Sequence, residues 1–598
     1  MNLEQAESIY KKALETQNID ERIELLHQIK STSNELKNIY VWVQNALGWA
    51  YLQTGEFNKA YVAFNKVIEE DTEPKLSIEA KYNIGTSFKK RGNLEQAIDI
   101  WKSLLHIQQD FYPDLNFNLY NNIGDAYRRL QKFTEAETYF LKVPQSDNFP
   151  YADAQLNLAK LCTDQEQLEK AIPYLTSIKN TKDTFKQYVL AQTSLAWVYA
   201  ELGQIEEART VWQGACRLEG ENEFDKLKKT YKYRLFESML EVGKPIFVKI
   251  FLKLGEILPL LVVKEPEDDL VAHYTDPTVT YLLLTHHRKK WHQVSDASKR
   301  NSLLRLNPIH FMNDPTEGKL IHKLLNINFA NLSGNMGKNN VDNLEVFMSC
   351  VTLHQNSLNQ FRLYGKENGV EASGCSLVLD REKLFGYEED IHWHTKQLNH
   401  EEDIHWHTEK LNHEETIQYG KDKLPLYRCI YFDPESGLIN IAHREEWTFC
   451  RQEQQATSAK WEAYKQKIDA ITKKVRDTVA EVKLLIQQAN KLIEVEEKPH
   501  LMTLLNEILL PLRYLIKHHA FKEEQECRFF YLTDLSATCV KLDQHRKRVY
   551  LDYANILPAM KKIYLPSKAF HHEGALQYLG QTSPYGKFEV KRSKNPFQ

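Results

Sequence analysis

Residues 47–64 read LGWAYLQTGEFNKAYVAF, and this stretch decides the fold of the first half of the chain. It opens with a small residue, Gly48, which is followed one helical turn later by an aromatic residue, Tyr51. A glycine-containing turn comes next, and the following segment carries Ala60 and Phe64. Residues three and four apart share one face of a helix, so the pattern predicts a hairpin of two helices. The small residues are expected where the helices cross closely, and the last aromatic is expected to fill the seam to the next hairpin.

The same signature recurs along the chain as far as Trp212. Its small residue stands at Gly48, Gly85, Gly124, Ala159 and Ala196. Its turn position is held by Gly55, Gly92, Gln131, Glu166 and Gly203. The copies are therefore 37, 39, 35 and 37 residues apart, close to the tetratricopeptide unit of about 34 residues, and the stretch resembles a tetratricopeptide array. The resemblance implies an all-α solenoid over residues 1–220, whose concave groove binds a protein or peptide partner.

The composition excludes several classes of protein. With 77 basic and 81 acidic residues, the formal net charge of −4 indicates neither a nucleic-acid partner nor an acidic membrane. The 8 cysteines form no CxxC pair, which argues against a zinc ribbon or a disulfide scaffold and favours a reducing compartment. The most apolar stretch, residues 246–263, is interrupted by charged residues, so no membrane span is expected. The N-terminus does not read as a secretory signal, and the expected location is the cytoplasm.

The second half of the chain has a different pattern of predicted secondary structure. Residues 221–263 read as helices that cap the array, since a solenoid needs its last apolar face covered. The charged, proline-containing residues 264–270 are predicted to form a linker. Short strand-like runs with helices between them predict an α+β effector domain over residues 271–598, with a mixed or antiparallel sheet and a long helical segment at residues 452–518.

Residues 388–413 consist of two near-identical copies of one segment, EEDIHWHTKQLNH and EEDIHWHTEKLNH. Each copy contains an HxH pair, which can present two imidazoles to one metal ion. A recent duplication is, however, tolerated only where it disturbs no core, and this favours a surface loop without a selected set of ligands. We therefore expect no metal in this protein.

Four motifs of the second half concentrate polar residues that are costly to bury and useful in a site. They are HYTD at 273–276, FMNDPTEG at 311–318, FMSCVT at 347–352 with FRLYGKENG at 361–369, and FKEEQECRF at 521–529. Their order resembles a bacterial family of uncharacterised C-terminal domains that are often found beside helical repeats. The resemblance runs over roughly residues 270–598 and names no established reaction. Cys527 and Gly586 depart from the aromatic and the arginine usual in the family, and the second departure weakens an anion-binding role for the end of the chain.

The order of these motifs is also similar to that of the site residues of ADP-ribosyltransferases, which implies NAD as cofactor. The resemblance assigns catalytic roles to Glu526, Glu524 and His273. It assigns cofactor-binding roles to His273, Tyr274, Asn313, Asp314, Ser349, Thr352, Arg362, Tyr364 and Arg528. Breaking the nicotinamide–ribose bond develops positive charge, which a fixed carboxylate stabilises. Two residues apart on a strand, Glu524 and Glu526 are expected to face the same side.

These residues also have structural interpretations. A histidine and a tyrosine that open a strand can anchor hydrogen bonds, Asn313-Asp314 before a proline suits a turn, and Glu526 with Arg528 can form an ordinary buried ion pair. Phosphate-binding loops, zinc-protease and serine-hydrolase motifs are absent from the sequence. The basic cluster at residues 286–290 lacks the aromatic residues of single-strand binders, so nucleic acid is not indicated.

Two classes of function follow from these alternatives. The first is a bacterial effector or defence protein whose C-terminal domain modifies a macromolecule by ADP-ribosyl transfer from NAD, while the repeats bind a partner or regulate the domain. The second is a non-enzymatic interaction or sensor protein, and a nuclease or nucleotide-hydrolysing effector is a further alternative. Convergence of His273, Ser349 and Glu526 in one open cleft favours the enzyme, whereas burial of Glu526 against Arg528 favours the sensor.

Overall fold

The computed structural model describes most of the chain. The described residues are 2–16, 19–30, 36–54, 56–70, 74–105, 115–146, 148–218, 231–285, 303–309, 318–327, 344–386, 423–452, 457–492, 498–537, 539–543 and 547–595. Two compact units divide the chain, residues 1–228 with 239–248 and residues 229–238 with 249–598. The duplicated segment 388–413 lies outside the described residues, as does the basic cluster at 286–290.

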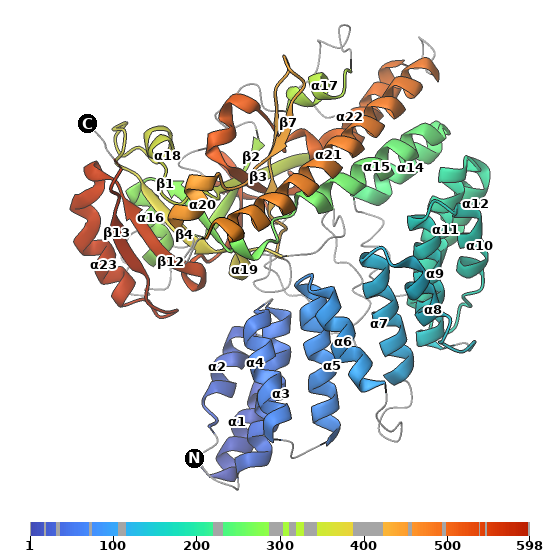
Figure 1. The fold of residues 1–598 in the computed structure, drawn as a ribbon, viewed down its shortest axis with the longest axis horizontal. Coiled ribbons are helices and arrows are strands. Elements are labelled where there is room, and N and C mark those ends of the chain that lie inside the picture. The colour runs from blue at the N-terminus through green and yellow to red at the C-terminus, as the bar shows by residue number, and fades with distance from the viewer. Residues whose placement is uncertain are drawn as a thin grey trace. The chain divides into compact units, whose positions relative to one another are not determined.

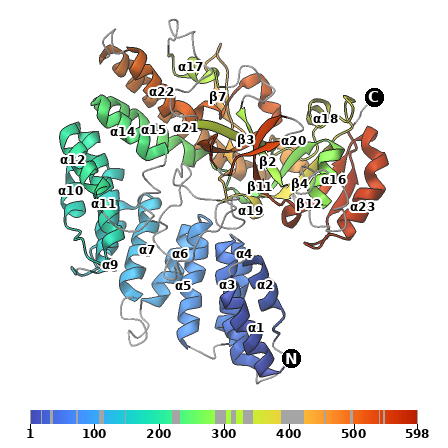
Figure 2. The ribbon, with the colours of Figure 1, turned by 180° about the vertical axis from the view of Figure 1, so that it is seen from behind.

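The first unit is built from paired helices, which Figures 1 and 2 show from opposite sides. In order they are α1 (Leu3–Glu15), α2 (Ile19–His27), α3 (Lys37–Gln53), α4 (Phe57–Glu70), α5 (Pro74–Lys90), α6 (Leu94–Leu104), α7 (Leu115–Arg129), α8 (Phe133–Phe140), α9 (Phe149–Asp164), α10 (Leu168–Thr176), α11 (Phe185–Leu202) and α12 (Ile205–Cys216). First helices of successive hairpins contact one another, α3 with α5, α7 with α9, and α9 with α11. The predicted tetratricopeptide-like solenoid is confirmed.

Where the small residue of the signature is glycine, it is required by the aromatic residue of the same hairpin. A Cβ atom added at Gly85 would lie 2.2 Å from the indole nitrogen of Trp101, and one at Gly124 would lie 2.5 Å from the ring of Phe140. Both aromatic side chains are buried. Because a Cβ cannot approach so closely, only glycine lets these helices cross at this distance.

Four turns of the array that lie within the described residues have a left-handed residue at the same position. Gly92, Gln131, Glu166 and Gly203 all have positive φ angles, between 57° and 85°. Glycine adopts this left-handed region without a steric cost, whereas Gln131 and Glu166 are strained there. The left-handed turn residue is therefore retained in these four hairpins even where glycine is replaced by another residue.

Two helices follow the array, α14 (Tyr231–Val242) and α15 (Pro245–Leu261). They occupy the stretch that the sequence predicts as capping helices. Among the described residues, no helix is long and apolar enough to cross a membrane.

The second unit contains a sheet of ten strands with helices around it. Its strands are β1 (Leu270–Thr275), β2 (Leu304–Pro308), β3 (Leu344–Thr352), β4 (Cys375–Asp380), β5 (Tyr427–Arg428), β9 (Glu526–Asp534), β10 (Lys541–Asp543), β11 (Arg548–Ala554), β12 (Met560–Leu565) and β13 (Glu589–Arg592). Pairing is antiparallel except between β12 and β13, so the sheet is mixed, as predicted. Strand β3 pairs with β9 over its whole length, and its other edge pairs with β2 and β1.

One face of this sheet carries the main hydrophobic core. Side chains alternate between faces along a strand, and this face presents Val271, Leu377, Val351 and Phe529 to the core. Helices α16 (Pro277–Thr285) and α23 (Glu573–Gln581) contribute leucines to the same core. The opposite face carries polar residues of β3 and β9, which are described with the candidate sites.

The remaining elements of this unit are short, apart from two helices. Three strands form a second sheet, β6 (Ile430–Phe432), β7 (Ile439–Ile441) and β8 (Ile516–His518). The helices are α17 (Leu320–Leu324), α18 (Leu358–Leu363), α19 (Arg381–Leu384), α20 (Glu446–Gln452), α21 (Ser458–Leu492) and α22 (Lys498–Arg513), with 3-10 turns η2 (Pro266–Asp268), η6 (His519–Glu524), η7 (Leu557–Ala559) and η8 (Ser567–His572). The predicted helical segment at 452–518 thus consists mainly of α21 and α22 and ends in a strand.

Residues 264–270 do not form a free linker. Asp268 is fully buried, and its carboxylate pairs with Arg428 at 2.6 Å and with Arg444 at 3.2 Å. Tyr464 donates to the same carboxylate at 3.1 Å, and the carboxylate of Glu265 also pairs with Arg428. We call these five residues the Asp268 cluster. The charged run therefore supplies the carboxylates that buried arginines of the domain require.

Candidate functional sites

The sequence-predicted site residues lie on both faces of the main sheet. Thr352 pairs with Glu526, and Ser349 pairs with Phe529, in the antiparallel register of β3 and β9. Because Ser349 and Thr352 are three residues apart on one strand, their side chains point to opposite faces. Ser349 is on the core face with Phe529, whereas Thr352 is on the polar face with Glu526.

His273 also belongs to the core face. It pairs with Leu377 of β4, which lies in the hydrophobic core, and its Nδ1 atom lies 3.1 Å from the carbonyl oxygen of Cys350. Burial lowers the pKa of His273, and the hydrogen bond to Cys350 opposes that shift. The described residues therefore do not bring His273, Ser349 and Glu526 into one cleft.

Tyr274 serves as an anchor for the chain before α18. Its hydroxyl donates to the carbonyl of His354 at 2.9 Å and accepts from the amide of Ser357 at 2.8 Å, while its ring packs edge-on against Phe361. Arg362 lies on α18 and is exposed. Asn313 and Asp314 lie outside the described residues.

On the polar face, two carboxylates share one lysine. Lys517 of β8 donates to Glu524 Oε2 at 2.5 Å and also to Glu526 Oε2. Arg528 Nε donates to Glu526 Oε1 at 2.7 Å, and the hydroxyl of Tyr364 lies 3.3 Å from Glu524 Oε1. These five residues form what we call the Lys517 cluster. Lys517 was not a predicted site residue, because it lies in the second sheet and outside the four motifs.

The backbone at Gln525 sets this arrangement. Glu524 ends η6, Glu526 begins β9, and Gln525 between them is left-handed with φ 47°. The sequence suggested that Glu524 and Glu526 lie on one strand, and this is wrong, because only Glu526 belongs to β9. Both carboxylates nevertheless reach Lys517. Thr352 stabilises the junction between η6 and β9, because its hydroxyl donates to the carbonyl of Glu524 at 2.5 Å.

The two carboxylates have pKa values shifted in opposite directions. Burial alone would raise the pKa of Glu526, but Arg528 and Lys517 outweigh it and hold that pKa well below its usual range. Burial and the neighbouring charge of Glu526 raise the pKa of Glu524, and Lys517 only partly offsets them. Such a divided pair is the arrangement that separates an acid from a base in many enzymes, and it also arises in structural ion networks.

The array carries a different cluster of charges, on its first helices. Asp125 of α7 pairs with Lys89 of α5 at 3.1 Å, and with Arg128 and Arg129 of its own helix at 2.8 and 3.0 Å. Arg128 also pairs with Asp164 of α9 at 2.5 Å. Together with Lys160, whose charge also acts on Asp125, these residues form the Asp125 cluster.

The Asp125 cluster, as defined above, contains four cations and two carboxylates. Burial alone would raise the pKa of Asp125, but Lys89, Arg129, Arg128 and Lys160 hold it well below its usual range. The side chains of Arg129 and Asp164 are 34% and 37% exposed, so the cluster reaches the surface. The cluster can therefore bind an anionic group of another molecule in addition to its own two carboxylates.

Fold and sites together define a tetratricopeptide-repeat protein with a C-terminal α+β domain. Sequence comparison agrees, since tetratricopeptide repeat profiles match residues 43–74, 79–107 and 117–145. The family described as "Protein of unknown function (DUF2971)" matches residues 360–529. The chain thus carries tetratricopeptide repeats followed by a domain of this uncharacterised family, as the motif order predicted. None of these matched profiles describes an ADP-ribosyltransferase.

The relatives and solved structures described here each match less than half of the chain. Protein O-mannosyl-transferase TMTC2 of Homo sapiens is 34% identical over 83 residues, which are 13% of this chain and 9% of that protein. The uncharacterized protein ycf37 of Cyanophora paradoxa is 27% identical over 112 residues, 18% of this chain and 63% of the relative. The chain therefore spans less than two thirds of either relative. A tetratricopeptide repeat protein from Parabacteroides merdae is 15% identical with a TM-score of 0.30, covering 40% of this chain and 87% of that one. The crystal structure of MamA is 20% identical with a TM-score of 0.23, covering 28% and 92%.

Proposed function

We propose that this chain is a protein-interaction protein whose repeat array binds an acidic segment of a partner protein at the Asp125 cluster. Tetratricopeptide repeats are protein-interaction modules, and solenoids bind partners along extended surfaces. The observation that carries the proposal is the gathering of four cations, Lys89, Arg128, Arg129 and Lys160, around Asp125 on three successive first helices.

The chemistry of the cluster favours a carboxylate or phosphate ligand. A guanidinium group such as that of Arg129 can donate two parallel hydrogen bonds to such an anion, whereas Arg128 already donates to Asp125 and Asp164. Lys89 is held in place by the amide oxygen of Asn122 at 3.2 Å, and the amide nitrogen of Asn122 donates to the hydroxyl of Tyr82 at 2.7 Å. These cations are therefore largely positioned before a ligand arrives, which lowers the entropic cost of binding.

Synthetic peptides test this proposal. Fluorescence anisotropy with the full chain would compare 12-residue peptides rich in aspartate and glutamate with matched peptides rich in serine or lysine. We expect the acidic peptides to bind at least about tenfold more tightly, a difference of about 1.4 kcal/mol, and to weaken as salt is added. Equal binding of acidic and serine-rich peptides would contradict the proposal.

A second candidate function places chemistry in the C-terminal domain. The opposite pKa shifts of Glu524 and Glu526 favour it, because they divide the buried pair into one carboxylate whose pKa is raised and one whose pKa is held low. In this candidate the domain modifies a macromolecule by ADP-ribosyl transfer from NAD, as expected of a bacterial effector or defence protein. Glu526 stabilises the ribosyl cation, and Glu524 with Tyr364 orients the acceptor. His273 and Ser349 would have no part in it, since they belong to the core face.

Incubation with labelled NAD and a cell lysate tests the second candidate. Transfer of label, or release of nicotinamide, is expected from the unmodified chain and is expected to disappear in Glu526→Gln. Glu523→Gln is the matched control, because Glu523 is exposed and pairs with Asn359 outside the Lys517 cluster. Turnover that persists in Glu526→Gln, or is absent from the unmodified chain, would exclude this candidate and leave the interaction function standing.

A further inference from the structure

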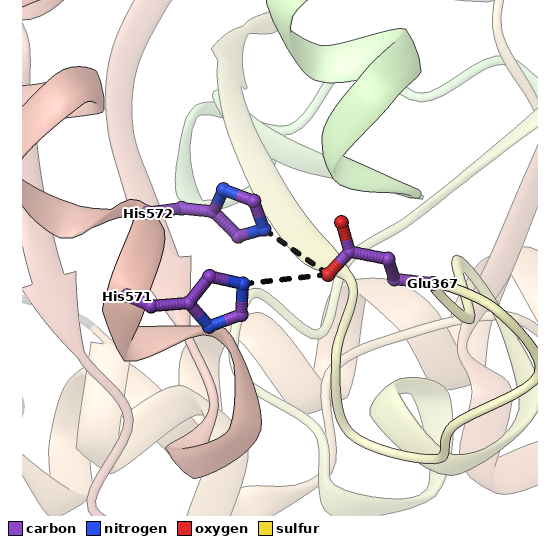
Figure 3. Close-up of side chains that lie close together, drawn as sticks. All are labelled: Glu367, His571 and His572. Carbon is purple, nitrogen blue, oxygen red and sulfur yellow. Dashed lines mark hydrogen bonds and ion pairs between the residues drawn. The ribbon is translucent and has the colours of Figure 1, made fainter.

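Three side chains that belong to no site described above converge on one point of the second unit. Figure 3 shows that His571 and His572 direct their rings toward the carboxylate of Glu367. The histidines end η8, and Glu367 lies in the loop between α18 and β4, about 200 residues earlier. The potential ligand atoms of all three residues lie within 4.8 Å of one another.

The distances within this trio suit a metal ion. Glu367 Oε2 lies 3.1 Å from His572 Nε2 and 3.5 Å from His571 Nε2. Zinc binds nitrogen and oxygen ligands at about 2.0–2.1 Å, which places neighbouring ligands of a tetrahedron about 3.3 Å apart. The two distances bracket this value, and the potential ligand atoms of the two histidines lie within 4.8 Å of each other.

Glu367 is held by a rigid turn. It pairs with Val370 across Asn368 and Gly369, whose φ angles of 52° and 77° are those of a type I′ turn. The amide of Glu367 also donates to the hydroxyl of Ser373 at 2.6 Å. The backbone that presents the carboxylate is therefore fixed.

His572 has a partner that would set its ring for coordination. Its Nδ1 atom lies 3.3 Å from the hydroxyl of Tyr281 in α16. When Nδ1 carries the proton and donates to this hydroxyl, Nε2 is left with a free lone pair toward Glu367. Metal-binding histidines regularly have such a second partner, which orients the ring and fixes the tautomer.

We propose that Glu367, His571 and His572 bind one divalent transition-metal ion of the zinc type. Two imidazoles and one carboxylate form the ligand set of open zinc sites, whereas calcium and magnesium prefer oxygen ligands alone. The side chain of His571 is 62% exposed, so the fourth position of the ion faces solvent and takes water or a ligand atom from another molecule. The ion joins the loop after α18 to the C-terminal segment of the domain, and the site departs from the sequence expectation of no metal.

Zinc titration of the full chain tests this proposal. The six histidines of residues 388–413 are first replaced by asparagine, because they could bind zinc independently. After treatment with a chelator, zinc is titrated against a chromophoric competitor, and cobalt is added in parallel to record its visible spectrum. We expect one ion per chain and a tetrahedral cobalt spectrum. Absence of binding in this background would overturn the proposal.

Substitutions separate a metal site from a hydrogen-bonded trio. Glu367→Gln keeps a hydrogen-bond acceptor but removes the charge, and His571→Ala alters an exposed side chain without touching the core. Both are expected to abolish the stoichiometric site, and Tyr281→Phe is expected to weaken it by about tenfold or more. His500→Ala, at an exposed histidine of α22, is the control and should leave binding unchanged. Circular dichroism verifies the fold of each variant, and zinc binding that persists in both Glu367→Gln and His571→Ala would overturn the proposal.

Discussion

The Asp268 cluster of the C-terminal domain and the Asp125 cluster of the array use the same chemistry for different ends. In each cluster, one carboxylate is surrounded by several cations. Around Asp268 every member is buried, and two carboxylates face two arginines. Around Asp125 four cations face two carboxylates, and Arg129 and Asp164 are about one third exposed.

The difference shows how charge balance and exposure separate a structural network from a binding surface. A balanced buried cluster contributes a fixed geometry, since each charge depends on a partner that water cannot replace. A cluster with surplus positive charge at the surface retains the capacity to bind an anion. We therefore assign the Asp268 cluster to the fold and the Asp125 cluster to partner binding.

Removal of Asp268 is expected to have the largest effect. Asp268→Ala leaves Arg428 and Arg444 buried with one carboxylate fewer, which should lower the free energy of unfolding by about 3–5 kcal/mol. Urea denaturation followed by circular dichroism measures this loss. Lys467→Ala is the control, because it removes a 3.3 Å pair with Glu267 whose lysine is 52% exposed, and a loss of no more than about 1 kcal/mol is expected there. Equal losses in the two variants would refute a structural role for the Asp268 cluster.

Removal of Asp125 should cost less stability and improve acidic-peptide binding. In Asp125→Ala, water can solvate part of the charge of Lys89, Arg128 and Arg129, so we expect a loss of only about 1–2 kcal/mol. The added net positive charge should tighten the binding of an acidic peptide. Urea denaturation and fluorescence anisotropy measure the two effects. A loss as large as that of Asp268→Ala, or weaker peptide binding, would argue that Asp125 has a purely structural role.

The pH dependence of stability sharpens the comparison further. The pKa of Asp125 and that of Glu265 are both held low in the folded chain, so each carboxylate contributes stability above its unfolded pKa of about 4. This stability is lost as the pH falls through the lower folded pKa. The difference in unfolding free energy between the unmodified chain and Asp125→Asn, and that for Glu265→Gln, should be constant from pH 7 to pH 5 and shrink below about pH 4. Urea denaturation at pH 7, 5 and 3 measures it, and a difference that disappears by pH 5 would contradict the assigned shifts.

Much of the array could be predicted from the sequence because its information is local. Gly85 and Trp101, or Gly124 and Phe140, lie 16 residues apart and contact each other within one hairpin. The buried pairing of Glu526 with Arg528 was foreseen as an alternative for the same reason. The sheet face on which each site residue lies was harder to predict. The three-residue spacing of Ser349 and Thr352 does, however, already place their side chains on opposite faces of a strand.

Chain reversals and long-range contacts explain what the sequence did not reveal. Lys517 is only 7 and 9 residues from Glu524 and Glu526, but it lies on a strand of the second sheet, and only the folded chain identifies it as their shared partner. The charges of residues 264–270 suggested an exposed linker. The arginines that form ion pairs with these carboxylates come from distant segments, so the sequence did not show that the run is buried. No sequence spacing could have joined Glu367 to His571 and His572.

The most direct test of the central claim is a charge exchange at the Asp125 cluster. Lys89→Glu combined with Arg129→Glu reverses two of its cations, and anisotropy titrations would compare acidic and lysine-rich peptides on this variant and on the unmodified chain. We predict that the unmodified chain prefers the acidic peptide and that the variant prefers the lysine-rich one, with both preferences reduced by salt. An acidic-peptide preference unchanged in the variant would show that partner binding occurs elsewhere on the chain.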